Sequence, residues 1–242
     1  MAVHLLRRDM CTAYVEGDPV SPSAAVVFWS APLSSARERA IAFGPNIEAL
    51  WSLLQAIGGW SAIGIREEHS GILKAAMERD LGKPVKVESH RYHVLTEPSQ
   101  TFTHPLVRRL VEADSNLVQQ APPFLQQGRL FGGARRLLHD GVFAGAIDSG
   151  ELVATAHTAT LTDEYAEIGV GTLARYRQQG IAAATASLIC REVQLMGRVP
   201  VWNCAEDNQP SRHLAEKLGF VSIGRRMDLI PAQDTALSLG SG

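Results

Sequence analysis

The sequence contains only three cysteines, and their positions exclude the usual cysteine-based frameworks. Cys11, Cys190 and Cys204 are far apart and odd in number. They form neither the paired pattern of a small disulfide-rich domain nor the close CxxC pairs of a zinc site. The first residues also lack the long apolar core of a signal peptide. Together these features favour a reducing, cytoplasmic compartment.

Long hydrophobic runs and highly charged tracts are missing as well. No stretch approaches the roughly 20 apolar residues of a membrane-spanning helix. The 242 residues carry a formal net charge of -2, and arginine pairs such as Arg108 and Arg109 are too short to form a basic tract. We therefore expect neither nucleic acid nor a membrane as a partner.

Several familiar catalytic motifs are absent or mismatched. There is no G-x-x-x-x-G-K-[ST] segment, and residues 59–64 miss the G-x-S-x-G spacing by one residue. His90 and His93 would point to opposite faces of a strand, so we expect no metal site there. Residues 169–174 match G-x-G-x-x-A, but the helix that this motif requires begins only at Gly180. We interpret these glycines as strand residues near a bulge.

The first hundred residues alternate between apolar runs and segments with helical periodicity. Pro45 in the first turn of one periodic segment and Gly58 at its end are typical helix boundaries, and Gly82 follows the second segment. This alternation predicts an α/β domain over residues 1–100, whose role the sequence leaves open. The predicted strands cover residues 24–29, 60–65 and 83–97, and the predicted helices cover residues 44–59 and 66–82.

Residues 96–105, TEPSQTFTHP, are typical of a linker, and a second domain is predicted over residues 104–232. Residues 148–150 predict a hairpin turn, and residues 233–242 predict a loose tail. No internal repeat is evident in the sequence. Within the second domain we expect a short strand within residues 106–114 and one or two irregular helices over residues 116–141. Further strands are expected at residues 142–147, 151–161, 165–173, 199–204 and 220–230, and further helices at residues 180–196 and 210–219.

The predicted helix over residues 180–196 has one apolar face. Its members are Ala182, Ala186, Ile189, Val193 and Met196. The opposite side carries Ser187, Arg191 and Gln194, so the helix is expected to pack on a sheet through its small residues.

The start of this helix has the features of an anion site. First-turn N–H groups lack intrahelical partners, and the helix dipole adds partial positive charge there. Gly180 has no Cβ, so a phosphate could approach the backbone, and Arg177, Gln178 and Gln179 supply further donors. A tight turn that merely requires glycine explains the same residues, and both interpretations stay open at this point.

Two segments resemble the GNAT N-acetyltransferases. Arg177, Gly180 and Ala182 match the family motif [RQ]-x-x-G-x-[GA]. Downstream, residues 200–220 resemble the second family segment, with a strand, Asn208, and a helix ending in EKLGF. The two segments occur in the family's order, separated by one helix. The residue pattern is most similar to that of a bacterial subgroup that includes antibiotic-resistance-type acetyltransferases. The resemblance covers residues 104–230.

This resemblance implies a mixed α/β fold in which acetyl-CoA lies between two splayed strands, here residues 167–173 and 199–204. It implies no metal. Its implied cofactor contacts are the backbone of Gly171, Thr172 and Leu173 for the pantetheine arm, Arg177 with the N–H groups of Gln178, Gln179, Gly180, Ile181, Ala182 and Ala183 for the pyrophosphate, and Asn208 and Ser211 beside the arm.

The resemblance also indicates how catalysis would proceed. A carboxylate can remove the proton from an amine, and Glu167 stands where some relatives carry an acid. An ordinary strand residue or a salt-bridge partner would explain Glu167 equally well. Many relatives carry a tyrosine that protonates the leaving sulfur, and this chain has Ala215 there. Tyr176 or Tyr165 could substitute, although Tyr176 suits a structural role in the turn. A thiol pKa near ~8.5 lets thiolate leave without a strong acid.

Two further positions lie beside the expected gap. Asn203 occupies a position that is acidic in some relatives, so no second base is expected. Trp202 stays open between a core residue and a ligand contact.

The expected activity is acetyl transfer from acetyl-CoA to an amine, most simply of a small molecule, with the N-terminal domain helping to wall the acceptor site. A CoA-binding regulatory protein without turnover and a protein N-acetyltransferase are the alternatives. Acceptor, acyl chain and oligomeric state stay open, a homodimer being one option.

Overall fold

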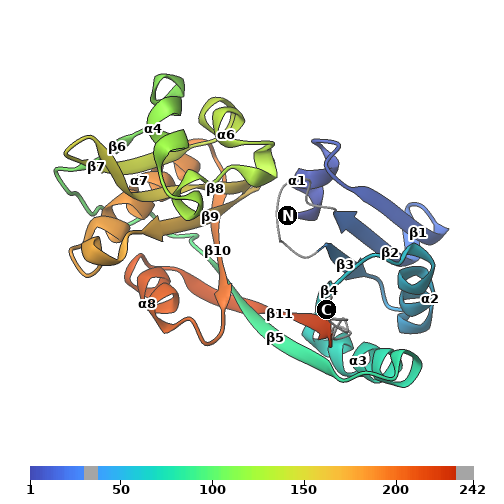
Figure 1. The fold of residues 1–242 in the computed structure, drawn as a ribbon. Helices are drawn as coiled ribbons and strands as arrows, with labels where there is room; N and C mark the ends of the chain where they lie inside the picture. The colour runs from blue at the N-terminus through green and yellow to red at the C-terminus, as the bar shows by residue number, and fades with distance from the viewer. Residues whose placement is uncertain (30–37, 233–242) are drawn as a thin grey trace, which may run out of the picture. The chain divides into compact units, whose positions relative to one another are not determined.

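The computed structural model describes residues 1–29 and 38–232, which form two compact units (Figure 1). Unit 1 consists of residues 1–10 and 90–224, and unit 2 of residues 11–29, 38–89 and 225–232. The sequence predicted a boundary near residue 100, whereas the chain passes between units within two long strands, β5 (Val85–Val94) and β11 (Val221–Pro231). An uninterrupted strand carries no linker composition, so this boundary leaves no signal in the sequence. The predicted loose tail lies outside the described residues.

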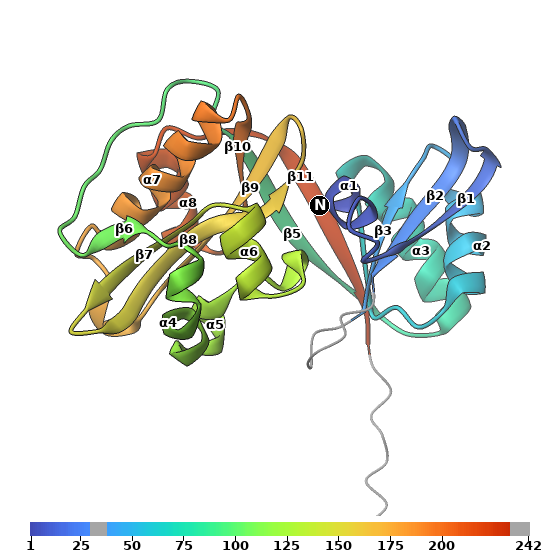
Figure 2. The same ribbon diagram turned by 90° about the horizontal axis from the view of Figure 1, so that it is seen from above.

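Unit 2 is a sheet with both of its helices on one face (Figure 2). Its strand order is β1-β2-β3-β4-β11, in which only β3 and β4 run parallel. Leu50, Leu54, Ile63, Leu73 and Met77 form its fully buried centre. The elements are β1 (Thr12–Asp18), β2 (Ser21–Trp29), β3 (Arg39–Phe43), α2 (Ile47–Ile57), β4 (Ala62–Arg66) and α3 (Glu67–Leu81).

The predicted helices of unit 2 are confirmed, with one change at a helix start. Asn46 is the N-cap of α2, so Pro45 precedes the cap and does not lie in the first turn. Gly82 ends α3 in the left-handed conformation that glycine favours. The sequence missed β1 and β3. All seven residues of β1 are exposed and therefore give no apolar run, and β3 has only five residues.

Unit 1 has strand order β5-β10-β9-β8-β7-β6, with α7 and α8 on one face and α4, α5 and α6 on the other (Figure 2). The turn at Ser149 and Gly150 joins β7 to β8, and the left-handed φ of both residues suits a tight hairpin. The elements are α1 (Ala2–Leu6), β6 (Val107–Arg109), η1 (Glu112–Asp114), α4 (Ser115–Gln120), α5 (Pro123–Gln126), η2 (Arg129–Phe131), α6 (Ala134–Asp140), β7 (Phe143–Asp148), β8 (Glu151–Leu161), β9 (Tyr165–Thr172), η3 (Ala174–Tyr176), α7 (Ile181–Leu195), β10 (Val199–Ala205) and α8 (Gln209–Lys217).

The segment over residues 96–105 is bonded to α7 along its length. Ser187 Oγ donates to the Gln100 carbonyl at 2.7 Å and accepts from the Phe102 N–H at 3.1 Å. The Gln194 side chain bonds to the backbone of Glu97 and Ser99. Ser187 is therefore buried, which corrects its predicted place on the open side of the helix. The polar residues on this side of α7 hold the segment in place.

The two units repeat one arrangement, which the sequence did not reveal. The order β1-β2-β3-α2-β4-α3-β5 corresponds to β7-β8-β9-α7-β10-α8-β11. In each, two antiparallel pairings are followed by one parallel pairing across a helix. The last strands are exchanged, because β5 pairs with β10 through residues 90–94 and β11 pairs with β4 through residues 226–229. This exchange makes each unit discontinuous in the sequence.

Candidate active site

A gap opens in unit 1 between the parallel strands β9 and β10. Their pairing runs from Tyr165 and Val199 to Ile168 and Trp202 and then stops. Strand β9 continues to Thr172 along β8, and β10 continues to Ala205 along β5. Each strand thus keeps its outer neighbour and leaves its inner edge unpaired. An extended amide-bearing ligand can pair with such an edge.

A bulge and two glycines accompany this divergence. The register between β8 and β9 shifts between Thr158 and Thr160, and a bulge of this kind bends a strand and increases its twist. A Cβ on Gly169 would lie 2.3 Å from the His157 ring, and one on Gly171 would lie 2.8 Å from Leu125. The expectation that these glycines are strand residues near a bulge is confirmed, and close packing explains why no larger residue fits.

The pairing register shows which backbone groups face the gap. Leu173 N–H donates to the Val153 carbonyl, so the neighbouring pair Thr172 and Ala154 is of the type without mutual hydrogen bonds. The N–H and C=O groups of Thr172, and of Val170 two residues earlier, therefore turn toward β10. The N–H of Leu173 is already occupied. Of the three backbone positions predicted for the pantetheine arm, Thr172 has the orientation that the arm requires.

The N-terminus of α7 provides a row of backbone donors. Ala184 N–H donates to the Gly180 carbonyl as the first intrahelical bond, so the preceding N–H groups lack partners within the helix. Gly180 has a φ of 81°, and nothing lies within 4 Å of where its Cβ would stand. Gln178 also has a positive φ, of 62°. The first turn contains no acidic residue and no side-chain cap. This terminus suits a phosphate.

Some of the side chains that precede Gly180 form hydrogen bonds within the turn. Gln179 Nε2 donates to the Arg175 carbonyl at 3.0 Å, and Arg177 Nε lies 3.5 Å from the Thr172 carbonyl. Both are exposed, as is Gln178. Ile181 and Ala183 are buried in the helix interface, and Ala182 is half-buried, so these three offer backbone groups only. The predicted residues from Arg177 to Ala183 thus form one continuous loop and helix start.

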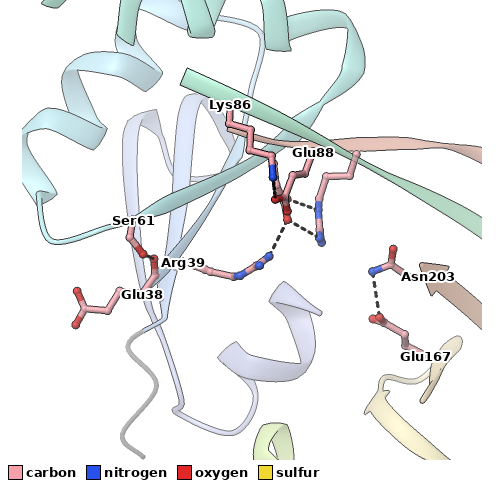
Figure 3. A network of polar contacts seen from close by, with 9 residues as sticks. Glu38, Arg39, Ser61, Lys86, Glu88, Glu167 and Asn203 are labelled. Carbon is pink, nitrogen blue, oxygen red and sulfur yellow. Dashed lines mark hydrogen bonds and ion pairs between the residues drawn. The ribbon is translucent and has the colours of Figure 1, made fainter. Parts of the chain in front are cut away.

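Glu167 and Asn203 meet where the pairing of β9 and β10 ends (Figure 3). Asn203 Nδ2 donates to Glu167 Oε1 at 3.4 Å. Both side chains point away from α7, because their strand neighbours Ile168 and Trp202 are buried in the α7 core. No salt bridge among the described residues includes Glu167. Of the two alternatives weighed for Glu167, the geometry disfavours an ion-pair role.

Asn208 and Ser211 both make local contacts that position α8. Asn208 is the N-cap, and its Oδ1 accepts from the Ser211 N–H at 3.2 Å. Ser211 Oγ accepts from Trp202 Nε1 at 3.0 Å, and the Trp202 ring packs against Phe220 at 5.5 Å. Trp202 is therefore a core residue. Asn208 is exposed, whereas the half-buried Ser211 bonds to the core residue Trp202.

The structure offers no obvious general acid at the predicted positions. Ala215 is fully buried in the α8 core. The Tyr176 hydroxyl donates to Asp148 at 2.7 Å, and this carboxylate raises the pKa of Tyr176. Tyr176 thus has the structural role in the turn that the sequence favoured. Tyr165 lies at the paired end of β9, two residues before Glu167.

Strand β5 adds residues that sequence reasoning assigned to another domain. Tyr92 lies opposite Asn203 and His90 lies opposite Ala205 in the β5–β10 register. Residues opposite each other in an antiparallel pair share a face, so both lie on the face that carries Glu167. The expected boundary near residue 100 hid this contribution. No sequence signal links β5 to β10, because the pairing joins residues more than a hundred positions apart.

A sequence profile of the GNAT acetyltransferase family matches residues 68–225, more than half of the chain. The chain belongs to the GNAT acetyltransferase family. A search of curated protein sequences gave no significant match.

Solved structures with the GNAT fold match nearly the whole chain. A GCN5-related N-acetyltransferase-like protein from Streptococcus suis is 18% identical, with a TM-score of 0.67 over 92% of this chain and 89% of that chain. A GCN5-related N-acetyltransferase from Kribbella flavida is 16% identical, with a TM-score of 0.63 over 96% and 94%. A tandem GNAT protein from the clavulanic acid biosynthesis pathway is 14% identical, with a TM-score of 0.56 over 92% and 83%. At these identities the likeness establishes the mixed α/β GNAT fold.

Two negative findings apply to residues 1–29 and 38–232. No helix there is long and apolar enough to cross a membrane. No group of three or more His, Cys, Asp or Glu side chains is arranged to hold a metal ion.

Proposed function

We propose that this GNAT protein transfers the acetyl group of acetyl-CoA to an amine of a small molecule. The observation that carries the proposal is the gap between β9 and β10, which ends beside the uncapped N-terminus of α7. The gap offers a backbone edge to the pantetheine amides, and the helix start offers N–H donors to the pyrophosphate. Glu167 stands on the same strand, within the paired part.

The chain's residues would act in the following order. The N–H groups of residues 178–183 hold the pyrophosphate, and the edge at Val170 and Thr172 aligns the thioester. Glu167 takes a proton from the amine, directly or through one water. The neutral amine nitrogen then attacks the thioester carbon, the C–S bond breaks with its electron pair on sulfur, and the second N–H proton passes from nitrogen to the thiolate. No acid is needed at Ala215, because a thiol with a pKa near ~8.5 leaves as thiolate.

A CoA-binding regulatory protein is the second candidate. Ala215 supplies no hydroxyl, and the hydroxyl of Tyr176 is bonded to Asp148, which favours a chain that binds the cofactor without turnover. The two candidates share a cofactor site and differ in rate. A cytoplasmic location fits both, because the buried thiols of Cys190 and Cys204 contribute to the core in reduced form.

Thermal unfolding in the presence of acetyl-CoA tests the shared part of both candidates. At 100 times its dissociation constant, a ligand adds about 2.7 kcal/mol to the free energy of unfolding, which raises Tm by several degrees at most in a chain of this size. We expect this shift with acetyl-CoA, and none with NADH or ATP. Absence of the shift, in folded protein free of copurified CoA, would overturn the cofactor site.

A further inference from the structure

The oxygen of the Asn203 side chain is buried without a hydrogen-bond donor. Among the described residues, no group donates to Asn203 Oδ1, although its solvent-accessible surface is essentially zero. A buried acceptor without a donor is destabilising, so such atoms are rare in folded proteins. The amide nitrogen of the same side chain is satisfied by Glu167 Oε1. The Asn203 side chain therefore holds an acceptor atom for which the described residues supply no donor.

The position of Asn203 limits what that donor can be. Asn203 is the first residue of β10 beyond the last pair with β9, and it lies on the face that carries Glu167 and Tyr92. Of the groups on this face, the Glu167 carboxylate and Asn203 Oδ1 both accept hydrogen bonds. A ligand atom that satisfies both must carry at least two hydrogens. An ammonium group fits this description and an alcohol oxygen does not.

We propose that Asn203 positions the acceptor by accepting one N–H of its amine, an inference that rests on the proposed acetyl transfer. A primary ammonium gives one proton to Glu167 and keeps two N–H groups. Nitrogen attacks the thioester carbon, sulfur leaves as thiolate, and the second proton passes to that thiolate. The third hydrogen remains on the product amide, bonded to Asn203 Oδ1 throughout. The Asn203 amide nitrogen meanwhile orients the Glu167 carboxylate. Acceptors that react through nitrogen are therefore favoured over those that react through oxygen.

The cofactor arm also contains amide N–H groups, which could satisfy the same oxygen. The two sources are separated by measuring the two substrates independently. Methylamine is a suitable probe acceptor because it is small, and methanol is its matched oxygen counterpart. Release of free thiol from acetyl-CoA reports turnover, and calorimetry reports acetyl-CoA affinity.

Asn203→Ala removes the acceptor oxygen. We expect the KM for methylamine to rise about tenfold, the cost of one hydrogen bond to a charged group, with acetyl-CoA affinity unchanged. Methanol should give no acceleration in wild type or variant. Asn203→Asp restores an acceptor oxygen and should recover most of the methylamine KM. Because it places a second carboxylate beside Glu167, it should also move the acid limb of the pH–rate profile to higher pH. Asn116→Ala, at an exposed asparagine on α4, is the matched control.

Each contrary result has a distinct meaning. Weaker acetyl-CoA binding in Asn203→Ala, with the methylamine KM unchanged, would assign the oxygen to the cofactor arm and overturn the proposal. Wild-type protein that binds acetyl-CoA but shows no methylamine-dependent thiol release would overturn it as well. Failure to bind acetyl-CoA would instead overturn the proposed function itself.

Discussion

The two units share one order of strands and helices, yet they differ at the start of the helix that connects their two parallel strands. This helix is α2 in unit 2 and α7 in unit 1. In unit 2, Asn46 Oδ1 accepts from the Ala49 N–H at 3.0 Å, and Glu48 adds a negative charge to the first turn of α2. In unit 1, Gly180 caps α7 without a side chain, and no acidic residue follows. The capped start stabilises α2, whereas the uncapped start of α7 leaves its backbone N–H donors available to a ligand. The shared fold alone therefore does not create an anion site. The residues at the helix start determine whether backbone N–H groups are available to an anion.

The carboxylates beside the two gaps differ in the same way. The parallel pairing in unit 2 ends at Ile41 and Gly64, and Asp228 lies against Gly64. Buried Asp228 is held by Arg39 at 2.7 Å and by Arg226 at 2.9 Å. Glu167 in unit 1 meets the neutral amide of Asn203 at 3.4 Å. Asp228 is held in an ion-pair network, whereas the neutral amide of Asn203 is the hydrogen-bond partner of Glu167.

The largest effect should come from removing the available carboxylate. Glu167→Gln keeps the shape of the side chain and removes its basicity, so we expect acetyl transfer to slow by about 10²–10⁴-fold. Acetyl-CoA affinity should stay unchanged. Steady-state thiol release and calorimetry measure the two quantities.

Asp228→Asn in unit 2 is the matched control for Glu167→Gln. It should lower the stability of the protein, because it breaks a buried ion-pair network, but it should spare the rate of the folded protein. Equal losses of rate in both variants would contradict the different roles of Glu167 and Asp228. If the wild-type protein binds acetyl-CoA but shows no turnover, the result would favour the CoA-binding regulatory protein.

Acid should destabilise unit 1 before unit 2. The buried histidines His4, His93 and His157 of the described chain all belong to unit 1, and burial lowers the pKa of each, to about 4 for His157. The unfolded chain takes up a proton near pH 6.5, and folded His157 does so only near pH 4. The contribution of His157 to the free energy of unfolding is thus fully present above pH 6.5. It falls by up to about 3 kcal/mol as the pH decreases toward 4.

Hydrogen exchange at pH 7 and pH 4.5 measures this difference residue by residue. Amides of unit 1 should lose protection at the lower pH while those of unit 2 keep it. The paired carboxylate Asp80 of unit 2 has a lowered pKa and so titrates outside this window. His157→Gln should flatten the pH dependence. Equal loss of protection in both units would contradict the prediction.

The smallest of these effects should come from transferring one residue between the helix starts. Unit 2 has Ile47, Glu48 and Ala49 where unit 1 has Ile181, Ala182 and Ala183. Ala182→Glu should stabilise α7 by about 0.3–1 kcal/mol through the helix dipole. The same charge should repel pyrophosphate and weaken acetyl-CoA binding about tenfold, a loss of about 1.4 kcal/mol.

Glu48→Ala in unit 2 provides the control for this transfer. It should leave acetyl-CoA affinity unaltered, since Asn46 still caps α2. Calorimetry of both variants also gives the number of binding sites, which we expect to be one per chain. A tight second site would show that α2 binds the cofactor despite its cap.

Local features of the site could be read from the sequence because they depend on neighbouring residues. The helix start at Gly180 and the strand character of Gly169 and Gly171 both follow from short-range chemistry. The structural role of Tyr176 was also anticipated. The backbone orientation at Thr172 was not, because it depends on the register with β8, which a single residue of slip reverses.

Features that depend on distant pairing escaped the sequence. The internal repeat is invisible because the corresponding elements share an arrangement while their residues differ, as Asn46 and Gly180 do. The burial of Ser187 depends on a segment some ninety positions earlier, since Ser187 bonds to Gln100 and Phe102. Strand β1 is exposed throughout and gave no apolar signal. Nothing local indicates any of these contacts.

The exchange of β5 and β11 has a consequence for how the protein is made. Unit 2 begins at residue 11, yet its sheet is completed by residues 226–229 of β11. On the ribosome, where N-terminal regions usually fold first, β4 must wait with an unpaired edge while unit 1 is synthesised. Unit 1 already has residues 90–94 of β5 when its own strands emerge. Unit 2 has most of its residues before those of unit 1 in the chain and is nevertheless completed last, so the β4 edge is open to mispairing until β11 is made.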